Sequence, residues 1–213
     1  MNTEQPVATQ GTAMPVRADA QRNAARVLAA ARRAVASTGL DVSYHEIARE
    51  AGVGVGTVYR RYPERDQLMA AVLSDILTEL IDTAHQALDC DDAWEGFSLL
   101  FTSLALRTAQ NAGLSGSLDQ HGGPAVAQQR HELLDLTRRV IERAQDQRRL
   151  RRDLAWREVL RLTGAPAVKG CVLGVEPDPA HGHHFVLTVL LDGLQTGRHR
   201  RRADAPRVDD IVR

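Results

Sequence analysis

The fold is decided by residues 43–62, which read SYHEIAREAGVGVGTVYRRY. Ser43 and Glu46 have the S-x-x-E spacing of a capping box, in which each residue satisfies a free backbone N–H group of the other. An apolar helix face follows, and Gly52 then permits a sharp turn at positive φ. The second helix of the pair is predicted over about residues 54–62. This stretch is therefore expected to form two short helices joined by a tight turn.

Composition favours an all-α fold. The chain has 213 residues, of which 43% are hydrophobic but only 4% aromatic, so its core must consist mainly of Ala, Leu and Val. Ala and Leu favour helix, and long β-branched runs are absent. The net charge is zero, yet residues 17–65 hold nine basic and five acidic side chains, which leaves +4 around the helix pair. Local charge matters because phosphate neutralisation depends on individual contacts.

Other residues indicate a soluble cytoplasmic protein. Cys90 and Cys171 form no C-x-x-C pair, which fits a reducing compartment. Residues 1–16 contain no signal-peptide core, and no stretch approaches the roughly 20 apolar residues of a membrane span. We find no G-x-S-x-G, P-loop or H-E-x-x-H motif, so we expect no enzyme, no catalytic residue and no cofactor. The His-rich segment 181–184 is interpreted as a loop and helix cap, with no metal site.

The remaining helices follow from apolar residues at steps of three and four. They are expected over about residues 20–37, 63–84, 94–104, 125–148, 156–162 and 184–196. The fourth helix carries one continuous apolar stripe, formed by Leu68, Val72, Ile76, Leu80 and Ala84. The predicted organisation is a disordered arm over residues 1–18, a helix-turn-helix domain over 20–80, a helical domain over 81–197 and a flexible charged tail over 198–213.

The helix pair has the features that a helix-turn-helix requires. Ala48 is small where the helices cross, and Val53 and Val58 can anchor the second helix from beneath. The exposed side of that helix would then enter the major groove of DNA. The alternative is a helical hairpin in an ordinary bundle, with its arginines merely solvated. The residues expected to meet DNA are Ser43, Tyr44, Val55, Gly56, Thr57, Tyr59, Arg60, Arg61 and Arg65.

The side chains of the second helix suit this task. Hydroxyl groups on Thr57 and Tyr59 can donate hydrogen bonds to phosphate oxygens. Arg60 or Arg61 can span N7 and O6 of a guanine. Val55, or the methyl group of Thr57, can meet the methyl group of a thymine.

Residues 54–68 read G-V-G-T-V-Y-R-R-Y-P-E-R-D-Q-L, a pattern that closely resembles the TetR/AcrR family of bacterial transcriptional regulators. The resemblance covers about residues 20–80. Gly54 stands where the family usually has a Ser cap, Tyr62 replaces Phe, and Arg65 replaces Lys. These changes keep the chemistry of phosphate contact, but the glycine is a weaker helix cap by a few tenths of a kcal/mol.

The resemblance implies that residues 81–197 form a dimerisation domain that encloses a ligand pocket. Candidates for the pocket lining are Trp94, Phe97, Phe101, Leu104, Arg107, Leu133, Leu136, Thr137, Val140 and Trp156. Arg107 can meet an acidic ligand group or end a helix in solvent. Candidates for the dimer interface, on the last helix, are Phe185, Thr188, Leu191 and Leu194. The alternative is that this helix lies inside the core of a single chain.

The partners implied are double-stranded operator DNA, a second copy of the chain and an unidentified small apolar or amphipathic effector. A dimeric repressor that its ligand releases from a pseudo-palindromic operator is the leading interpretation. An architectural DNA-binding protein without ligand and a transcriptional activator are the alternatives. The sequence names neither the ligand nor the operator.

Overall fold

The computed structural model describes residues 13–38, 42–110, 123–167 and 182–197. The regular structure in these ranges is helical, and an isolated antiparallel bridge between Leu150 and Gln195 is its only β-type pairing. The predicted all-α class is thus confirmed. Of the expected arm, residues 13–18 belong to the first helix, while residues 1–12 lie outside the described residues, as does the expected tail over 198–213.

The chain divides into two compact units, Met1–Val72 and Leu73–Arg213. The division falls within helix α4 (Arg65–Asp89), a little before the expected boundary at residues 80–81. All five residues of the predicted apolar stripe on this helix are buried. α4 therefore belongs to both units, and its apolar stripe supplies core residues to each.

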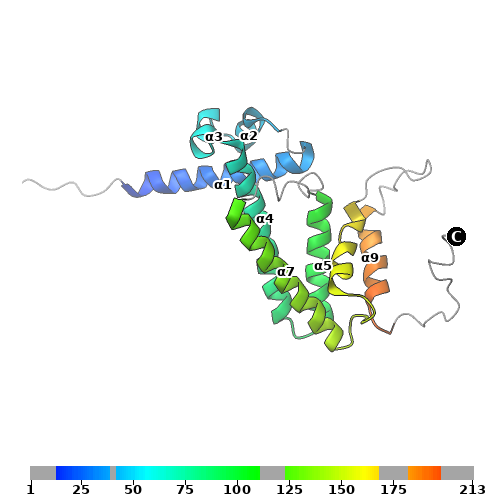
Figure 1. Cartoon of the computed structure of the whole chain (residues 1–213). Coiled ribbons are helices and arrows are strands. Elements are labelled where there is room, and N and C mark those ends of the chain that lie inside the picture. The colour runs from blue at the N-terminus through cyan, green and yellow to red at the C-terminus, as the bar shows by residue number, and fades with distance from the viewer. Residues whose placement is uncertain (1–12, 39–41, 111–122, 168–181, 198–213) are drawn as a thin grey trace, which may run out of the picture. The chain divides into compact units, whose positions relative to one another are not determined.

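The N-terminal unit contains α1 (Ala13–Thr38), α2 (Tyr44–Ala51), α3 (Val55–Arg61) and the first turns of α4. Figure 1 shows α2 and α3 as two short neighbouring helices. Small and branched apolar side chains fill the core, as the low aromatic content requires. Its buried residues include Val27, Ala31, Ala34, Val35, Ile47, Ala48, Ala51, Val58, Leu68 and Val72.

Two arginines of α1 hold α2 in place. Arg26 donates a hydrogen bond to the carbonyl oxygen of Gly52 at 3.3 Å, and Arg33 pairs with Glu50. Both belong to the nine basic residues that give this segment its positive charge. Their contacts lie inside the unit, so fewer charges are free for a partner than the sequence count indicates.

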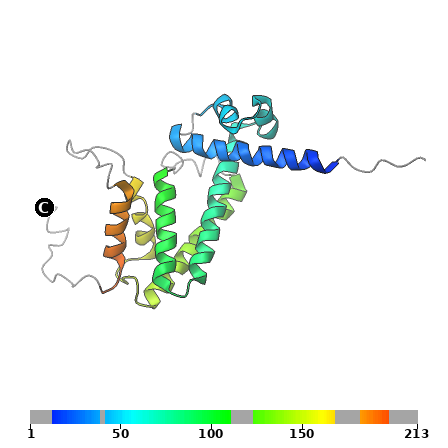
Figure 2. The same cartoon turned by 180° about the vertical axis from the view of Figure 1, so that it is seen from behind.

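The C-terminal unit contains the rest of α4, followed by α5 (Ala93–Gln110), α7 (Gly123–Asp146), α8 (Trp156–Leu162), the 3-10 helix η2 (Ala165–Ala167) and α9 (Gly182–Leu194). α5 is central, since it packs against α7, η2 and α9. Figures 1 and 2 show α5 between α7 and α9 from two opposite sides.

The C-terminal end of α4 is fixed at two points within this unit. A Cβ atom at Gly96 would lie 2.1 Å from the carbonyl oxygen of Ala87, so α5 approaches α4 more closely than any side chain allows. Arg143 on α7 donates hydrogen bonds to the carbonyl oxygens of Ala87, Leu88, Cys90 and Asp91. A guanidinium at a helix C-terminus satisfies carbonyl groups that lack a partner in the helix.

The C-terminal end of α9 is hydrogen-bonded to the segment that connects α7 and α8. Arg148 adopts a positive φ of 55° there. The amide of Arg151 donates to the carbonyl of Leu194, and the amide of Thr196 donates to the carbonyl of Arg149. These hydrogen bonds fix the last helix at its C-terminal end.

None of the described helices combines the length and the apolar character that a bilayer crossing requires. Across the same residues, no three His, Cys, Asp or Glu side chains gather in a way that could hold a metal ion. Cys90 is a free thiol, and Cys171 lies outside the described residues.

Candidate nucleic-acid interface

The interface begins with a tightly capped α2. The hydroxyl oxygen of Ser43 accepts from the Glu46 amide at 3.2 Å, and the Glu46 carboxylate accepts from the Ser43 amide at 2.9 Å. The predicted capping box is therefore confirmed. The hydrogen bond from the Ser43 backbone, followed by that from its hydroxyl, lowers the pKa of Glu46. Gly52 ends α2 at φ 63°, the positive value predicted for the turn.

The helix that follows, α3, presents most of its surface to solvent. Val58 is its only buried residue and anchors it to the core, as predicted. Gly56, Tyr59, Arg60 and Arg61 are exposed, and the Tyr59 side chain is 50% exposed. Val55 and Thr57 are half-buried. The helix starts at Gly54 with no side-chain cap, so its N-terminal amide groups are left for water or another acceptor.

The two arginines of α3 form no ion pair with any carboxylate in the described part of the chain. Arg60 lies back along the helix, where Nε donates to the carbonyl of Gly56 at 3.2 Å and Nη2 to the hydroxyl of Thr57 at 3.5 Å. The guanidinium carbon of Arg61 lies 5.6 Å from the ring centroid of Tyr62. Such weak local contacts can be exchanged for stronger charge-assisted hydrogen bonds to phosphate or guanine.

Three of the residues predicted to contact DNA form hydrogen bonds within the N-terminal unit. Tyr44 is only 8% exposed, and its hydroxyl donates to the carbonyl of Tyr62 at 2.9 Å. Arg65 donates from Nη1 to the carbonyl of Val42, also at 2.9 Å. The Ser43 hydroxyl takes part in the capping box. Because a phenol has one proton to donate, the Tyr44 hydroxyl is occupied as a donor in this conformation, and a contact between Tyr44 and DNA stays a prediction.

A capped helix, a positive-φ glycine turn and a second helix with an exposed basic face define a helix-turn-helix unit of the DNA-binding type. Comparison with known proteins leads to the same class. Residues 27–72 match bacterial regulatory proteins of the tetR family. A TetR transcription regulatory protein from Mycobacterium vanbaalenii is 30% identical, with a TM-score of 0.62, and the match covers 85% of this chain and 100% of that protein. The chain belongs to the TetR family.

Two further proteins that resemble this chain are also transcriptional regulators. A TetR transcriptional regulator from Streptomyces coelicolor is 25% identical over 81% of this chain and 98% of its own, with a TM-score of 0.62. An HTH-type transcriptional regulator from Mycobacterium tuberculosis is 41% identical over 68 residues, which are 32% of this chain. That match spans only 35% of the length of the curated relative. The similarity to it therefore covers about a third of each chain.

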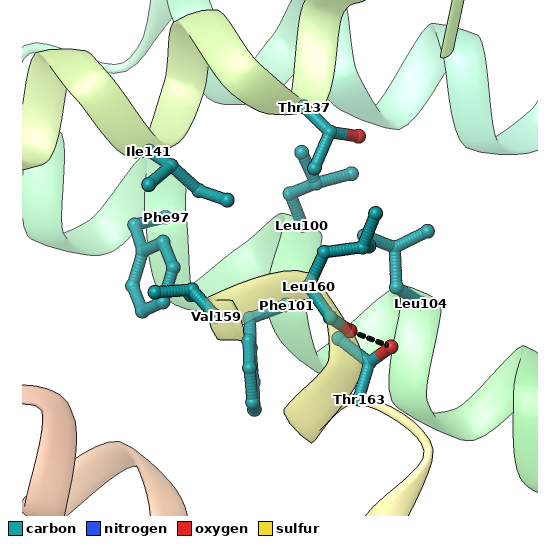
Figure 3. A pocket seen from close by; sticks show the side chains of 9 residues that line it. All are labelled: Phe97, Leu100, Phe101, Leu104, Thr137, Ile141, Val159, Leu160 and Thr163. Atoms are coloured by element: carbon teal, nitrogen blue, oxygen red, sulfur yellow. Dashed lines mark hydrogen bonds between the residues drawn. The ribbon is translucent and has the colours of Figure 1, made fainter. Parts of the chain in front are cut away.

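A small cavity lies in the C-terminal unit. Its volume is about 10 Å³, which is close to the space that one water molecule needs. Figure 3 shows its lining, which comes from α5, α7 and the end of α8 and contains no charged side chain. The lining residues are Phe97, Leu100, Phe101, Leu104, Thr137, Ile141, Val159, Leu160 and Thr163.

Two of the lining residues are threonines, which carry its side-chain hydroxyl groups. Thr163 donates to the carbonyl of Leu160 at 2.7 Å, the bond drawn in Figure 3. Thr137, the other threonine of the lining, is 2% exposed.

Four of the predicted pocket residues line the cavity, namely Phe97, Phe101, Leu104 and Thr137. The other six do not. Leu133, Leu136 and Val140 are buried in the core of the unit, and Trp94 and Trp156 are half-buried. Arg107 forms an ion pair with Glu79 at 2.6 Å.

Five lining residues were not predicted. Leu100 and Ile141 lie on apolar stripes that the sequence shows, so their helical spacing could have identified them. Val159, Leu160 and Thr163 belong to a short helix followed by Gly164 and Pro166, where the periodicity is too brief to show which face is buried.

The predicted interface helix, α9, exposes an apolar face in this single chain. Phe185 is 58% exposed and Val189 54%, and Val186 beside them is also exposed. Thr188 is exposed and Leu191 half-buried. Leu194, by contrast, is buried in the core of its own chain, so it cannot reach a partner in this conformation.

Proposed function

We propose that the chain is a homodimeric repressor that binds a pseudo-palindromic operator through two copies of α3 and leaves it when a small molecule binds in the C-terminal unit. The exposed basic face of α3 carries this proposal. Arg60 and Arg61 have no carboxylate partner in the described part of the chain, and Tyr59 is half exposed beside them. A helical hairpin with a purely structural role would not require an exposed basic surface on α3. This function would place the protein in the cytoplasm, with the chromosome.

A double substitution tests DNA binding. Tyr59→Ala with Arg60→Ala should weaken binding to the protein's own promoter DNA by about 100-fold, because each lost contact costs about 1–3 kcal/mol. Gel retardation measures the affinity, and thermal unfolding reports the fold. Arg139→Ala, at an exposed position on α7, is the matched control and should leave affinity unchanged. Unchanged binding by the double variant would contradict the proposal.

The exposed face of α9 supports the homodimer. Two-fold symmetry would place the two copies of α3 about 34–36 Å apart, on successive turns of the DNA. Phe185→Glu with Val189→Glu should therefore yield a monomer in sedimentation and abolish binding to the two-half-site operator. A variant that remained dimeric would show that another surface joins the subunits.

The apolar lining of the cavity supports a neutral, largely apolar effector. A charged ligand would be buried without a partner, which is costly. Entry of such a ligand requires the lining side chains to move apart, since the cavity now holds about one water. α4 runs from one unit into the other and gives this movement a covalent route to the DNA-binding end.

A screen for thermal stabilisation with neutral apolar compounds would find candidate effectors, since binding to the native state raises its apparent stability. Each hit should also lower operator affinity. A ligand that left this affinity unchanged would contradict the coupling, which requires different affinities in the two states. Reporter transcription that rises with the protein would establish activation in place of repression.

A further inference from the structure

Two long-range hydrogen bonds connect the segment at the start of α2 with the C-cap of α3 and the first residue of α4. The hydroxyl of Tyr44 donates to the carbonyl of Tyr62, and the guanidinium of Arg65 donates to the carbonyl of Val42, each at 2.9 Å. Segments 42–44 and 62–65 therefore exchange one hydrogen bond in each direction. We call these two interactions the clasp.

The clasp acts where α3 has few other anchors. The helix has seven residues, too few to be stable in isolation. Its N-cap, Gly54, supplies no side-chain hydrogen bond, and Val58 is its only buried residue. Tyr62 is the C-cap, so the Tyr44 hydroxyl binds the point at which the helix ends. Through Tyr44, the clasp thus constrains the C-terminal end of α3 from outside the helix.

Tyr44 also supports the exposed tyrosine of α3. Its ring centroid lies 4.7 Å from that of Tyr59, with the planes tilted by 56°. Aromatic pairs at such distances attract each other in tilted arrangements. Burial raises the pKa of Tyr44, which keeps its hydroxyl protonated as a donor. One side chain therefore contacts both Tyr59 and the end of the helix.

We propose that Tyr44 and Arg65 are positioning residues, which set the orientation of α3 for reading bases. This inference rests on the proposed DNA-binding function. It predicts a specific defect. A lost phosphate contact weakens binding to all sequences alike, whereas a misoriented helix loses contacts to bases and so loses its preference for the operator.

The test uses two duplexes of equal length, one selected by the wild-type protein from a random library and one with the same bases scrambled. Tyr44→Phe keeps the ring and removes only the hydrogen bond. The dissociation constant for the selected duplex should rise about fivefold, as expected for one lost hydrogen bond, while that for the scrambled duplex stays the same. Equal weakening on both duplexes, or no change on either, would overturn the inference.

Salt dependence provides the test for Arg65. Arg65→Gln should leave the slope of log affinity against log salt unchanged on the scrambled duplex and reduce the preference for the selected one. Arg61→Gln, on the exposed face of α3, is the matched control and should reduce the slope by about 0.9, the value for one phosphate contact. A similar reduction in Arg65→Gln would show a phosphate contact and overturn its assignment.

Hydrogen exchange in the free, full-length protein tests the clasp without DNA. In Tyr44→Phe, the amides of α3 should exchange faster, whereas those of α5 should not change. Equal acceleration in both helices would indicate general destabilisation and overturn a positioning role. If the wild-type protein selected no duplex at all, the proposed function would fail, while this measurement would still decide whether the clasp holds α3.

Discussion

The two units differ in how far apart along the chain their candidate site residues lie. The exposed side chains proposed to meet DNA fall within the single helix α3, residues 55–61. The cavity of the C-terminal unit instead collects residues from 97 to 163, on three helices. A short motif can therefore describe the first site, whereas only packing creates the second.

The largest effect is expected where the C-terminal unit is packed most closely. In Gly96→Val, the new Cβ atom meets the backbone oxygen of Ala87 at 2.1 Å, which no side-chain rotation can relieve. The free energy of unfolding should fall by about 3 kcal/mol, the upper part of the range for overpacking. Urea denaturation measures it.

Gly56→Ala is the control for this substitution. A Cβ atom at Gly56 meets nothing within 4 Å, and the residue lies inside α3. Alanine should raise stability by up to about 1 kcal/mol, since it favours helix over glycine. Equal urea midpoints for Gly96→Val and the wild type would show that the contact between α4 and α5 does not limit the fold.

The next effect concerns the arginine anchor of the same unit. Arg143→Met removes the donors to four carbonyl oxygens at the end of α4 and should cost about 2 kcal/mol, because hydrogen bonds from a charged donor are the stronger kind. Arg139→Met, at an exposed position of α7 four residues before Arg143, should stay within about 0.5 kcal/mol of the wild type. Similar losses in both variants would attribute the effect to charge alone.

A smaller effect is expected in the cavity, where two threonines serve as a matched pair. Thr137→Val replaces a hydroxyl by a methyl group in an otherwise apolar lining and should raise stability by about 1 kcal/mol. Thr163→Val removes a hydroxyl that donates to Leu160 and should lower stability by about 0.5 kcal/mol. Thermal unfolding compares them. Destabilisation by Thr137→Val would mean that its hydroxyl is already satisfied.

The smallest effect belongs to the capping box of the N-terminal unit. The pKa of Glu46 lies below its ordinary value of 4.5, so its carboxylate stabilises the folded state above that pH. This contribution is lost as the pH falls through the lower pKa of the folded state. The melting temperature of Glu46→Gln should therefore be below that of the wild type at neutral pH, and the two should converge in acid. A constant difference would exclude ionisation as the cause.

Much of the N-terminal unit could be predicted because its decisive interactions are local. The capping box joins residues three apart, and the turn depends on the φ of Gly52 alone. The apolar stripe of α4 follows from helical periodicity. The partners of Tyr44 and Arg65 could not be predicted, since they lie 18 and 23 positions away. A helical face shows that a residue points inward or outward, but not which distant carbonyl its side chain reaches.

The sequence by itself determined the all-α class, the helix-turn-helix and the face of α3 that carries Tyr59 and Arg60. These depend on helix propensity, capping and the positive φ of one glycine, all of which act over a few residues. Only the tertiary structure decided which polar side chains form hydrogen bonds within the protein. It assigned Tyr44 and Arg65 to internal carbonyls and placed Thr137 in the lining of an apolar cavity. The physical reason is that hydrogen bonds between distant segments form only after the chain has packed.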